Sequence, residues 1–378
     1  MRLTARELGR ATLARQLLLR REALPVTEAV RRLVALQAQE PASPYLALWN
    51  RLEDFAPAEL DAALHGADLV KATLIRITLH LVHAEDHAGI HTAMQPSLRG
   101  ARLADPRFTI SGLTARDADA VLPELLEFLA TPRSAEQAQQ WLTERLGVPG
   151  KPVWWAMRQV APLRHVPTGG PWQFGPRPAY TTAGPPPPGG PEAWDAPLPA
   201  LVRRYLAAFG PATPADVAQF LFTQRARVRA AVQALDGELE HLEGPDGEDL
   251  LDVPGSPRPG GDVPAPPRLL GMWDQVLLAH ADRTRVLPAE YRRTVARTNG
   301  DVLPTLLVDG LVAGVWRPVD GGVEAHAFSP LARADWVGLA AEAAPLSALL
   351  AERDPRTYRR YDRWWATLPD GERRVLPG

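Results

Sequence analysis

One theme, short helices followed by paired strands, repeats three times along this chain and restricts its fold more than any other feature. The first instance has helical periodicity followed by two β-branched and leucine-rich runs, residues 69–75 and 78–83, which predict a hairpin. Two further instances occupy residues 115–182 and 198–252. Three helices and a hairpin are typical of a winged helix, in which the second and third helices form a helix-turn-helix and the hairpin forms the wing. The sequence therefore predicts an α+β fold with three tandem winged-helix units.

Stretches rich in proline and glycine divide the chain into parts. The run GPPPPGG at residues 184–190 predicts a loop, and residues 253–267 carry six prolines and three glycines. Beyond them, strand-like runs around Asp309-Gly310, a favoured two-residue hairpin turn, predict a small β-barrel-like domain. Helices are expected after it, at residues 332–343 and 346–353. We therefore expect three winged-helix units and a C-terminal β-barrel-like domain with a helical tail, at residues 1–110, 111–190, 191–260 and 261–378.

Two glutamines, Gln37 and Gln39, stand where the second predicted helix of the first unit, residues 26–37, must end. Pro41 lacks an amide hydrogen and pushes Glu40 out of helical geometry, and Ser43 before a proline predicts the N-cap of the next helix. The two amides then lie in a joint between helices, where their side chains can converge. Each offers two donors and an acceptor without formal charge, so the pair can hold a water or grip a base and sugar. A solvated surface pair is the more common outcome at a helix end.

Four runs of the chain resemble, in the same order, the bacterial winged helix DNA-binding domain-containing family, which includes AlkZ-like and YcaQ-like DNA glycosylases. The runs are VALQAQEPASPYLALWNRLEDF, LIRITLHLVHAEDH, LLAHADRTRVLP and PTLLVDGLVAGVWR. The AlkZ-like branch has a catalytic motif of Gln, an apolar residue and Gln, which maps onto Gln37, Ala38 and Gln39. The YcaQ-like branch has aspartate at the second polar position, so this chain resembles the AlkZ-like branch. The resemblance implies that Gln37 and Gln39 are catalytic.

The implied activity is that of a monofunctional DNA glycosylase without a cofactor. Its expected substrates are cationic alkylated purines in double-stranded DNA, N7-alkylguanine and N3-alkyladenine, extending to bulky adducts and interstrand crosslinks such as those of azinomycin-type natural products, in DNA repair or self-resistance. A cationic base is already a good leaving group, so the reaction needs a positioned water and an environment that tolerates positive charge at C1′. Amide oxygens supply both. No lysine lies in the glutamine motif, so a Schiff-base lyase step is not expected.

Five further residues are candidates for contact with DNA. Arg76 and His80 lie in the predicted wing, and Arg283 and Arg285 occupy alternate positions of a polar, basic run between apolar flanks. Arg51, near the end of the third predicted helix, is the fifth. The alternatives are a core histidine at position 80 and an ion network between Asp282 and its neighbouring arginines.

Charge is segregated along the sequence, although the net charge of −2 does not by itself indicate a nucleic-acid binder. Residues 1–32 hold eight arginines against three glutamates, and residues 353–363 hold five more arginines. Residues 236–252 hold eight acidic side chains and neither lysine nor arginine. We expect a basic surface that meets phosphates, the alternative being that each run is a solvated helix face.

Composition excludes several classes of site. The chain has no cysteine, which removes disulfides, thiolate catalysis and zinc–thiolate sites. His83, His87 and His91 have helical spacing, but without a His-Glu-x-x-His pattern we expect no metal site. No apolar stretch approaches the ~18 residues of a membrane span. We expect a cytoplasmic, nucleoid-associated monomer. Two other classes stay open: a winged-helix transcriptional regulator, and a non-catalytic resistance protein that binds a lesion or drug.

Overall fold

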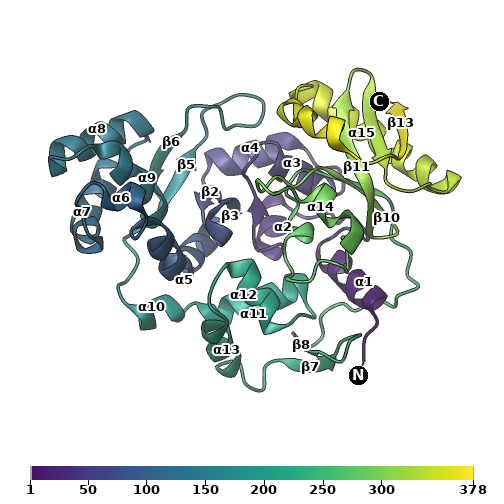
Figure 1. Cartoon of the computed structure of the whole chain (residues 1–378), viewed down its shortest axis with the longest axis horizontal. Helices are drawn as coiled ribbons and strands as arrows, with labels where there is room; N and C mark the ends of the chain where they lie inside the picture. The colour runs from purple at the N-terminus through teal and green to yellow at the C-terminus, as the bar shows by residue number, and fades with distance from the viewer. Residues whose placement is uncertain (1, 378) are drawn as a thin grey trace.

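The computed structural model describes residues 2–377 and has a mixed α/β architecture in which three β-sheets lie among the helices (Figure 1). The sheets have six, five and two strands. Each is open, with two free edge strands, so the expectation of a β-barrel-like C-terminal domain is wrong. None of the helices within residues 2–377 is both long and apolar enough to cross a membrane.

The six-stranded sheet consists of two three-stranded halves joined side by side. Its order is β1-β3-β2-β5-β6-β4, and all its neighbouring strands are antiparallel. The strands are β1 (Leu36–Gln37), β2 (Leu69–Thr73), β3 (Leu79–His83), β4 (Arg133–Ser134), β5 (Leu163–Val166) and β6 (Ala179–Thr182). Lys71 on β2 faces His165 on β5 at the seam between the halves. In each half the first strand of the hairpin lies at the seam, the second strand lies next to it, and the short strand lies at the outer edge of the sheet. The two halves are therefore mirror images in strand order.

The helices around the first half differ from the prediction near the glutamines. They are α1 (Ala5–Arg15), α2 (Val26–Arg32), α3 (Ser43–Trp49), α4 (Pro57–His65) and α5 (Ala84–Arg102). The predicted helix at residues 26–37 is too long, because Leu36 and Gln37 pair with Leu81 and His80 of β3 instead. Ser43 is also not an N-cap: α3 begins there, its cap residue is Ala42, and the Ser43 hydroxyl bonds to the Tyr358 hydroxyl at 3.1 Å. Tertiary pairing overrides the local helical pattern at both points.

The same order of elements, helix, short strand or bridge, two helices and a hairpin, occurs twice more. The elements are α6 (Pro106–Thr109), α7 (Ala115–Phe128), α8 (Ala135–Leu146), α9 (Gly150–Val160), α10 (Pro191–Asp195), α11 (Leu198–Phe209), α12 (Pro214–Leu221), α13 (Arg225–Gln233), β7 (Glu240–Glu243) and β8 (Asp249–Asp252). Capping boxes at Thr114, Ser134 and Thr213 begin α7, α8 and α12, because each side chain satisfies a free amide at the helix start. Residues 171–174, which lie between β5 and β6, do not form a strand.

The C-terminal part is a five-stranded antiparallel sheet with a long helix. Its order is β13-β12-β11-β10-β9. The elements are β9 (Arg268–Leu270), η2 (Gln275–Leu277), η3 (Ala289–Tyr291), α14 (Arg292–Val295), β10 (Thr305–Val308), β11 (Leu311–Val319), β12 (Gly322–Ala327), α15 (Arg333–Arg353), η4 (Arg359–Thr367) and β13 (Glu372–Pro377). Asp309 and Gly310 both have positive φ, as a type I′ turn requires. The two predicted C-terminal helices form one, α15, which contains Pro345.

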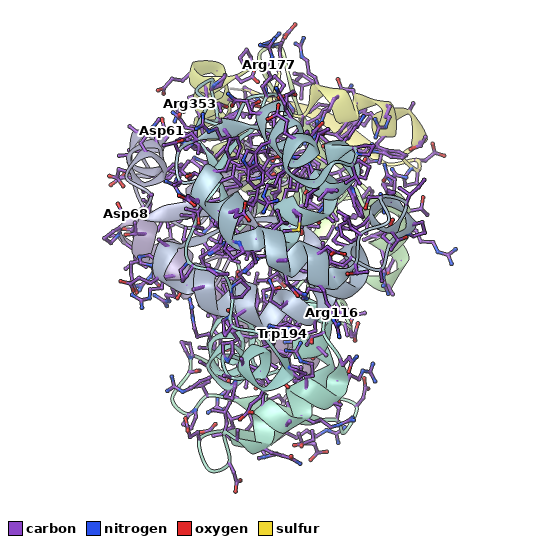
Figure 2. The ribbon with its side chains drawn as sticks, turned by 90° about the vertical axis from the view of Figure 1, so that its left-hand side faces the viewer. Asp61, Asp68, Arg116, Arg177, Trp194 and Arg353 are labelled. Atoms are coloured by element: carbon purple, nitrogen blue, oxygen red, sulfur yellow. The ribbon has the colours of Figure 1, made fainter. Side chains whose placement is uncertain are left out.

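The hydrophobic core joins the two ends of the chain. One cluster of buried side chains contains Tyr45 and Leu46 of α3 together with Trp316 of β11 and Trp336 of α15. An ion pair at 2.6 Å between Asp61 of α4 and Arg353 at the end of α15 lies over this contact (Figure 2). The first helices and the C-terminal sheet therefore support the segment that carries the glutamines from both sides.

Candidate active site

Gln37 is held inside the first half of the large sheet. It lies on β1 opposite His80 of β3, and 5% of the residue is exposed. Its Oε1 accepts a hydrogen bond from Nη2 of Arg76 at 2.8 Å. Because a guanidinium has donors and no acceptor, this bond determines which end of the amide faces Arg76. The Gln37 amide nitrogen must then point away from the arginine.

Arg76 reaches this bond from a tight turn between β2 and β3. The turn is the 3₁₀ segment η1 (Ile75–Ile77), in which Arg76 and Ile77 have φ of +53° and +57°. Positive φ is unfavourable for a β-branched residue, so the surrounding fold must hold this turn in place. The guanidinium lies over the Phe220 ring, 5.5 Å from its centroid. Burial, and next the neighbouring Arg283, lower the pKa of Arg76 to about 10, which leaves it charged at neutral pH.

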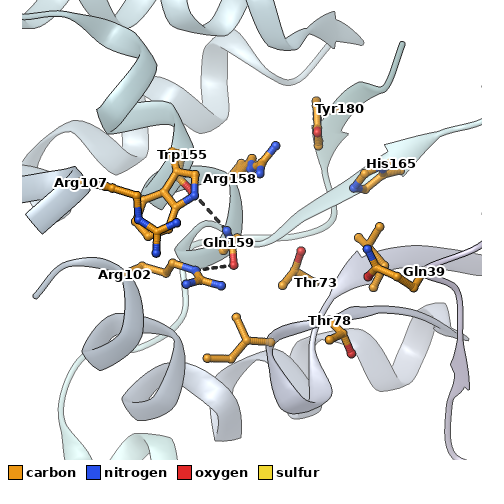
Figure 3. A pocket seen from close by; sticks show the side chains of 12 residues that line it. Gln39, Thr73, Thr78, Arg102, Arg107, Trp155, Arg158, Gln159, His165 and Tyr180 are labelled. Carbon is orange, nitrogen blue, oxygen red and sulfur yellow. Dashed lines mark hydrogen bonds between the residues drawn. The ribbon is translucent and has the colours of Figure 1, made fainter. Parts of the chain in front are cut away.

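Gln39 is exposed and borders a cavity of about 280 Å³ (Figure 3). The Ala38 amide donates to the Leu79 carbonyl at 2.8 Å, which continues the ladder of β1 toward the cavity. Both glutamines therefore lie beside the turn between β2 and β3. Gln37 bonds to Arg76 of this turn in the interior, and Gln39 lies at the mouth of the cavity. The cavity lining is Gln39, Thr73, Ile77, Thr78, Leu79, Arg102, Arg107, Trp155, Arg158, Gln159, His165 and Tyr180.

The cavity wall contains no carboxylate and no side chain that exchanges a proton near neutral pH. Burial, and then the charges of Lys71 and Arg158, lower the pKa of His165 to about 3. Burial raises the pKa of Tyr180 above its usual value. The remaining ionisable groups of the wall are guanidiniums. Chemistry in this cavity therefore has to proceed without a general acid of the wall.

The structure engages three of the residues predicted to contact DNA in internal contacts, and two of them, His80 and Arg51, are buried. His80 is 1% exposed, and burial, followed by the charge of Arg76, lowers its pKa to about 3, so it is a neutral histidine whose Nδ1 bonds to the Thr78 carbonyl at 3.0 Å. Arg51 is fully buried and makes two bonds to Asp274, at 2.7 and 2.8 Å. Arg285 donates to the Thr12 hydroxyl and the Pro211 carbonyl. These contacts are structural and give no support to DNA contacts at the three positions.

Arg283 stands apart from its neighbour at position 285. The Asp282 carboxylate accepts bonds from the Thr284 amide and hydroxyl, so the alternative of an ion network between Asp282 and the arginines is not present. Arg283 is half-buried, and burial, followed by Arg292, lowers its pKa. Its positive charge lies close enough to Arg76 to lower the pKa of that residue.

Glu40 and Lys71 flank the glutamine motif without entering the cavity. The Glu40 carboxylate contacts Arg360 at 2.5 Å and accepts a bond from the Tyr361 hydroxyl, while burial raises its pKa. Nζ of Lys71 lies 4.4 Å from the centroid of the Phe174 ring, and 4% of the residue is exposed. Burial lowers the pKa of Lys71 to about 8.

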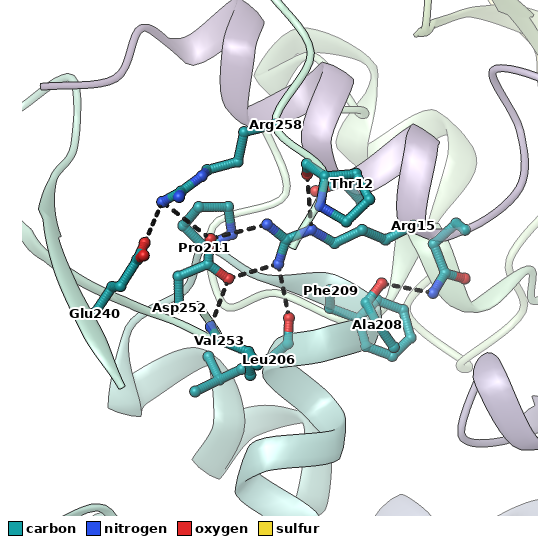
Figure 4. A network of polar contacts seen from close by, with 12 residues as sticks. Thr12, Arg15, Leu206, Ala208, Phe209, Pro211, Glu240, Asp252, Val253 and Arg258 are labelled. Carbon is teal, nitrogen blue, oxygen red and sulfur yellow. Dashed lines mark hydrogen bonds and ion pairs between the residues drawn. The ribbon is translucent and has the colours of Figure 1, made fainter. Parts of the chain in front are cut away.

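Most arginines of the two basic runs pair with carboxylates, and several of them also remain exposed to solvent. All five arginines of residues 353–363 have a carboxylate partner, and so do seven of the eight arginines of residues 1–32. The acidic run supplies some of these partners: Asp252 pairs with Arg15 at 2.6 Å in the interior (Figure 4), and Glu243 with Arg2. Charge that is segregated in sequence is paired in space.

No group of three His, Asp or Glu side chains that could hold a metal ion occurs within residues 2–377. His87 and His91 stack with ring centroids 5.5 Å apart, and burial lowers the pKa of both. Their helical spacing thus serves packing between α5 and its neighbours.

A family model for DNA glycosylases of the AlkZ-like type matches residues 30–349, which include both glutamines, Arg76 and the whole cavity wall. The chain belongs to the AlkZ-like DNA glycosylase family. A Streptomyces sahachiroi protein named interstrand DNA cross-link repair glycosylase is 30% identical over 131 residues, a stretch that spans 33% of this chain and 35% of that protein. The solved structure of Streptomyces sahachiroi DNA glycosylase AlkZ superposes with a TM-score of 0.77 at 24% identity, covering 93% of this chain and 98% of that one. This likeness shows a shared fold.

The sequence of this AlkZ-like chain did not predict the residues that form the cavity wall opposite Gln39. Arg102, Arg107 and Arg158 come from α5, α6 and α9, and Trp155 lies one helical turn before Arg158. Nothing in their spacing marks them as a group, because their proximity depends on how α9 packs against α5 and α6. The seam between β2 and β5 then brings this group to the same cavity as Gln39.

Proposed function

We propose that this AlkZ-like chain is a monofunctional DNA glycosylase that removes cationic alkylated purines from double-stranded DNA. The supporting observation is the cavity beside Gln39, whose wall carries no group able to protonate a leaving base near neutral pH. Excision there requires a base that leaves without protonation. A purine alkylated at guanine N7 or adenine N3 already carries the positive charge that makes it such a leaving group. The proposed substrates extend to bulky adducts and interstrand crosslinks, in line with the name of the Streptomyces relative.

The two amides have different parts in this proposal. Gln39, in the opening, holds the attacking water with its side-chain oxygen beside C1′ and faces the sugar cation. Gln37 is a positioning residue, whose oxygen is engaged by Arg76 and whose amide nitrogen is free to orient Gln39 or the water. An uncharged, preorganised acceptor stabilises the developing cation without forming an ion pair with the base.

We further propose that the chain contains three winged-helix units within residues 1–110, 111–190 and 191–260. The helix-turn-helix pairs are α3–α4, α8–α9 and α12–α13, and the wings are β2–β3, β5–β6 and β7–β8. The recurrence of one element order three times supports this division, as does the Ala212–Leu251 bridge, which stands where β1 and β4 stand in the first two units. Residues 261–378 form the C-terminal sheet domain with α15, and the chain acts as a monomer.

The decisive experiment follows release of N7-methylguanine from a duplex with a single lesion, detected by alkaline strand cleavage. The wild type releases the base, and Gln39→Ala lowers the single-turnover rate by about 100-fold or more, as removal of one preorganised polar group does elsewhere. Gln140→Ala, an exposed glutamine on α8, is the matched control and retains the wild-type rate. Full release by the Gln37→Ala/Gln39→Ala protein would contradict the assignment of the motif.

A wild type inactive on N7-methylguanine is then assayed on a bulky adduct and on an azinomycin-type crosslink. Release there identifies a specialist for large lesions. Binding of these substrates without release identifies the non-catalytic resistance protein, and the absence of lesion-dependent binding identifies the regulator.

No covalent enzyme–DNA intermediate is expected during excision. The two lysines of the chain are Lys71 and Lys151, and Lys71 lies beside a cavity of about 10 Å³, which is too small for a deoxyribose. Borohydride added during turnover should therefore trap no protein–DNA adduct. A trapped adduct that disappears in Lys71→Met would overturn the monofunctional assignment.

A further inference from the structure

Three arginines form the wall of the cavity that faces Gln39. Arg102 ends α5, Arg107 lies on α6 and Arg158 lies on α9 (Figure 3). The guanidiniums of Arg102 and Arg107 both lie over the ring of Trp155, 4.8 and 4.0 Å from its centroid. The aromatic ring brings two like charges together, which is unfavourable unless an anion joins them.

The local carboxylate, Asp105, pairs with only one arginine of this group. Asp105 is bound to Arg107, at 2.8 and 2.9 Å. Within residues 2–377, no carboxylate lies within 4.0 Å of the guanidinium of Arg102 or Arg158. Burial, and then the charge of Arg107, lower the pKa of Arg102. The cavity wall therefore holds two guanidiniums, those of Arg102 and Arg158, that have no carboxylate partner.

An uncharged neighbour holds Arg102 in a defined orientation. Nε of Arg102 donates to Oε1 of Gln159 at 2.6 Å, and Nε2 of Gln159 donates to the Trp155 carbonyl at 3.2 Å. Gln159 is 7% exposed, so its own position is set by the interior. The guanidinium is thus oriented without being neutralised. A fixed fork of donors without a counter-charge is suited to the oxygens of a phosphate.

We propose that Arg102 and Arg158, with Arg107 beside them, bind a backbone phosphate of the DNA strand that carries the excised base. The inference rests on the proposed function for the identity of the ligand and adds the strand and the contact. A phosphate is one sugar away from the C1′ atom of its own nucleotide. A phosphate site in the same cavity as Gln39 therefore belongs to the strand whose sugar Gln39 faces. Trp155 and Gln159 are positioning residues for this clamp.

The first test measures binding rather than excision. The affinity for a duplex with an uncharged tetrahydrofuran abasic analogue is determined as a function of salt for the wild type and for Arg102→Gln/Arg158→Gln. Each phosphate contact removed lowers the magnitude of the slope of log K against log salt by about 1, and the two arginines share one phosphate, so the expected decrease is about 1. Arg116→Gln/Arg177→Gln is the charge-matched control, because both arginines are exposed, lie outside the cavity and belong to the same part of the chain (Figure 2). The control keeps the wild-type slope.

The second test identifies the strand. Neutral methylphosphonates replace single phosphates flanking the abasic analogue, in either strand. We expect one lesion-strand replacement to weaken the wild type about as much as the two substitutions do, and to weaken Arg102→Gln/Arg158→Gln no further. Equal salt slopes for the two double variants, or equal responses of wild type and variant to every methylphosphonate, overturn the proposal. If the salt slopes of wild type and variant differ as expected but the wild type excises no base, the glycosylase function is refuted and the phosphate site is still supported.

Discussion

At the scale of single residues, the orientation of Gln37 depends on one neighbour. The Arg76 guanidinium has only hydrogen-bond donors, so it bonds to the amide oxygen of Gln37. The turn that carries Arg76 has a strained backbone, with positive φ at two successive residues. Sequence alone brings the two glutamines into a joint, but it does not show that an arginine from the neighbouring hairpin sets the orientation of one of them.

Arg76→Gln should therefore lower the rate of excision with little change in binding. We expect a decrease of about tenfold in the single-turnover rate at saturating enzyme, because a small misplacement of a catalytic group is costly. Arg283→Gln is the comparison: this arginine lies near Arg76 and has no hydrogen bond to Gln37, so its loss should weaken DNA binding and leave the saturated rate unchanged. Rate and binding effects in the reverse pattern would contradict these roles.

Lys71 is a second residue whose environment leads to a measurable expectation. Burial lowers its pKa from 10.5 to about 8, so the unfolded chain holds a proton that the folded chain releases between these values. The destabilisation is therefore complete below pH 8 and disappears as the pH rises toward 10.5. Lys71→Met should raise the free energy of unfolding at pH 7 by on the order of 2 kcal/mol. Urea unfolding tests this, with exposed Lys151→Met as the neutral control; a less stable Lys71→Met protein would exclude the argument.

At the scale of elements, two short segments from distant parts of the chain hold the glutamine motif in place. β3 pairs with β1, which carries Gln37, and the segment that begins η4 contacts the residues after the motif. In that segment the buried Tyr358 hydroxyl forms a hydrogen bond with the Ser43 hydroxyl at 3.1 Å and accepts one from the Met272 amide at 3.0 Å. The side chains of Arg360 and Tyr361 both contact the Glu40 carboxylate. The motif is therefore fixed by tertiary contacts rather than by a helix end.

Tyr358→Phe tests the support from the C-terminal segment. The substitution leaves the buried Met272 amide without its acceptor, which should lower the free energy of unfolding by about 1–3 kcal/mol. Tyr291→Phe is a matched control, because the Tyr291 hydroxyl bonds to Ser329 at a half-exposed position and water can replace it. Denaturant unfolding of both variants measures the difference, and equal losses of stability would argue against a buried, satisfied hydroxyl at position 358.

These elements also show what the sequence could and could not predict. Helix starts such as Thr213 are encoded by neighbouring residues and were predictable from them. The two-residue strand β1 was not, because its only signal is the pairing of Leu36 and Gln37 with a strand far along the chain. The glutamines stand out in the sequence at a predicted helix end, and family resemblance implies their role, whereas Arg102 and Arg158 come together only when helices of different parts pack. The local sequence pattern encodes helix starts, but it does not encode contacts that form only through tertiary packing.

At the scale of the whole molecule, charge and titration follow from long-range packing. The arginine-rich ends of the chain could be read from the sequence as basic runs, but not their pairing with carboxylates, of which the interior Arg15–Asp252 pair is the clearest case. Histidines are affected in the same way. Burial lowers the pKa of six of the nine: His80, His87, His91, His165, His280 and His326.

The protein should consequently lose stability in mild acid. Unfolded histidines bind protons near pH 6.5, whereas most of the buried ones stay neutral to about pH 3 or 4, so stability present above pH 6.5 is lost as the pH falls below it. The melting temperature should decrease steadily between pH 6.5 and 4.5. His87→Leu, which removes a ring without hydrogen-bond partners, should reduce proton uptake on unfolding at pH 5 by about one. Exposed His65→Leu serves as the control, and a melting temperature constant over this range would refute the expectation.

The seam between β2 and β5 has a consequence for how such proteins diverge. Gln39 lies on one side of it, while Trp155, Arg158 and Gln159 lie on the other. Mutations accumulating beyond the seam can reshape the cavity without touching the glutamines. Under the proposed function, descendants of one ancestor can thus acquire new lesion preferences while keeping the same two glutamines.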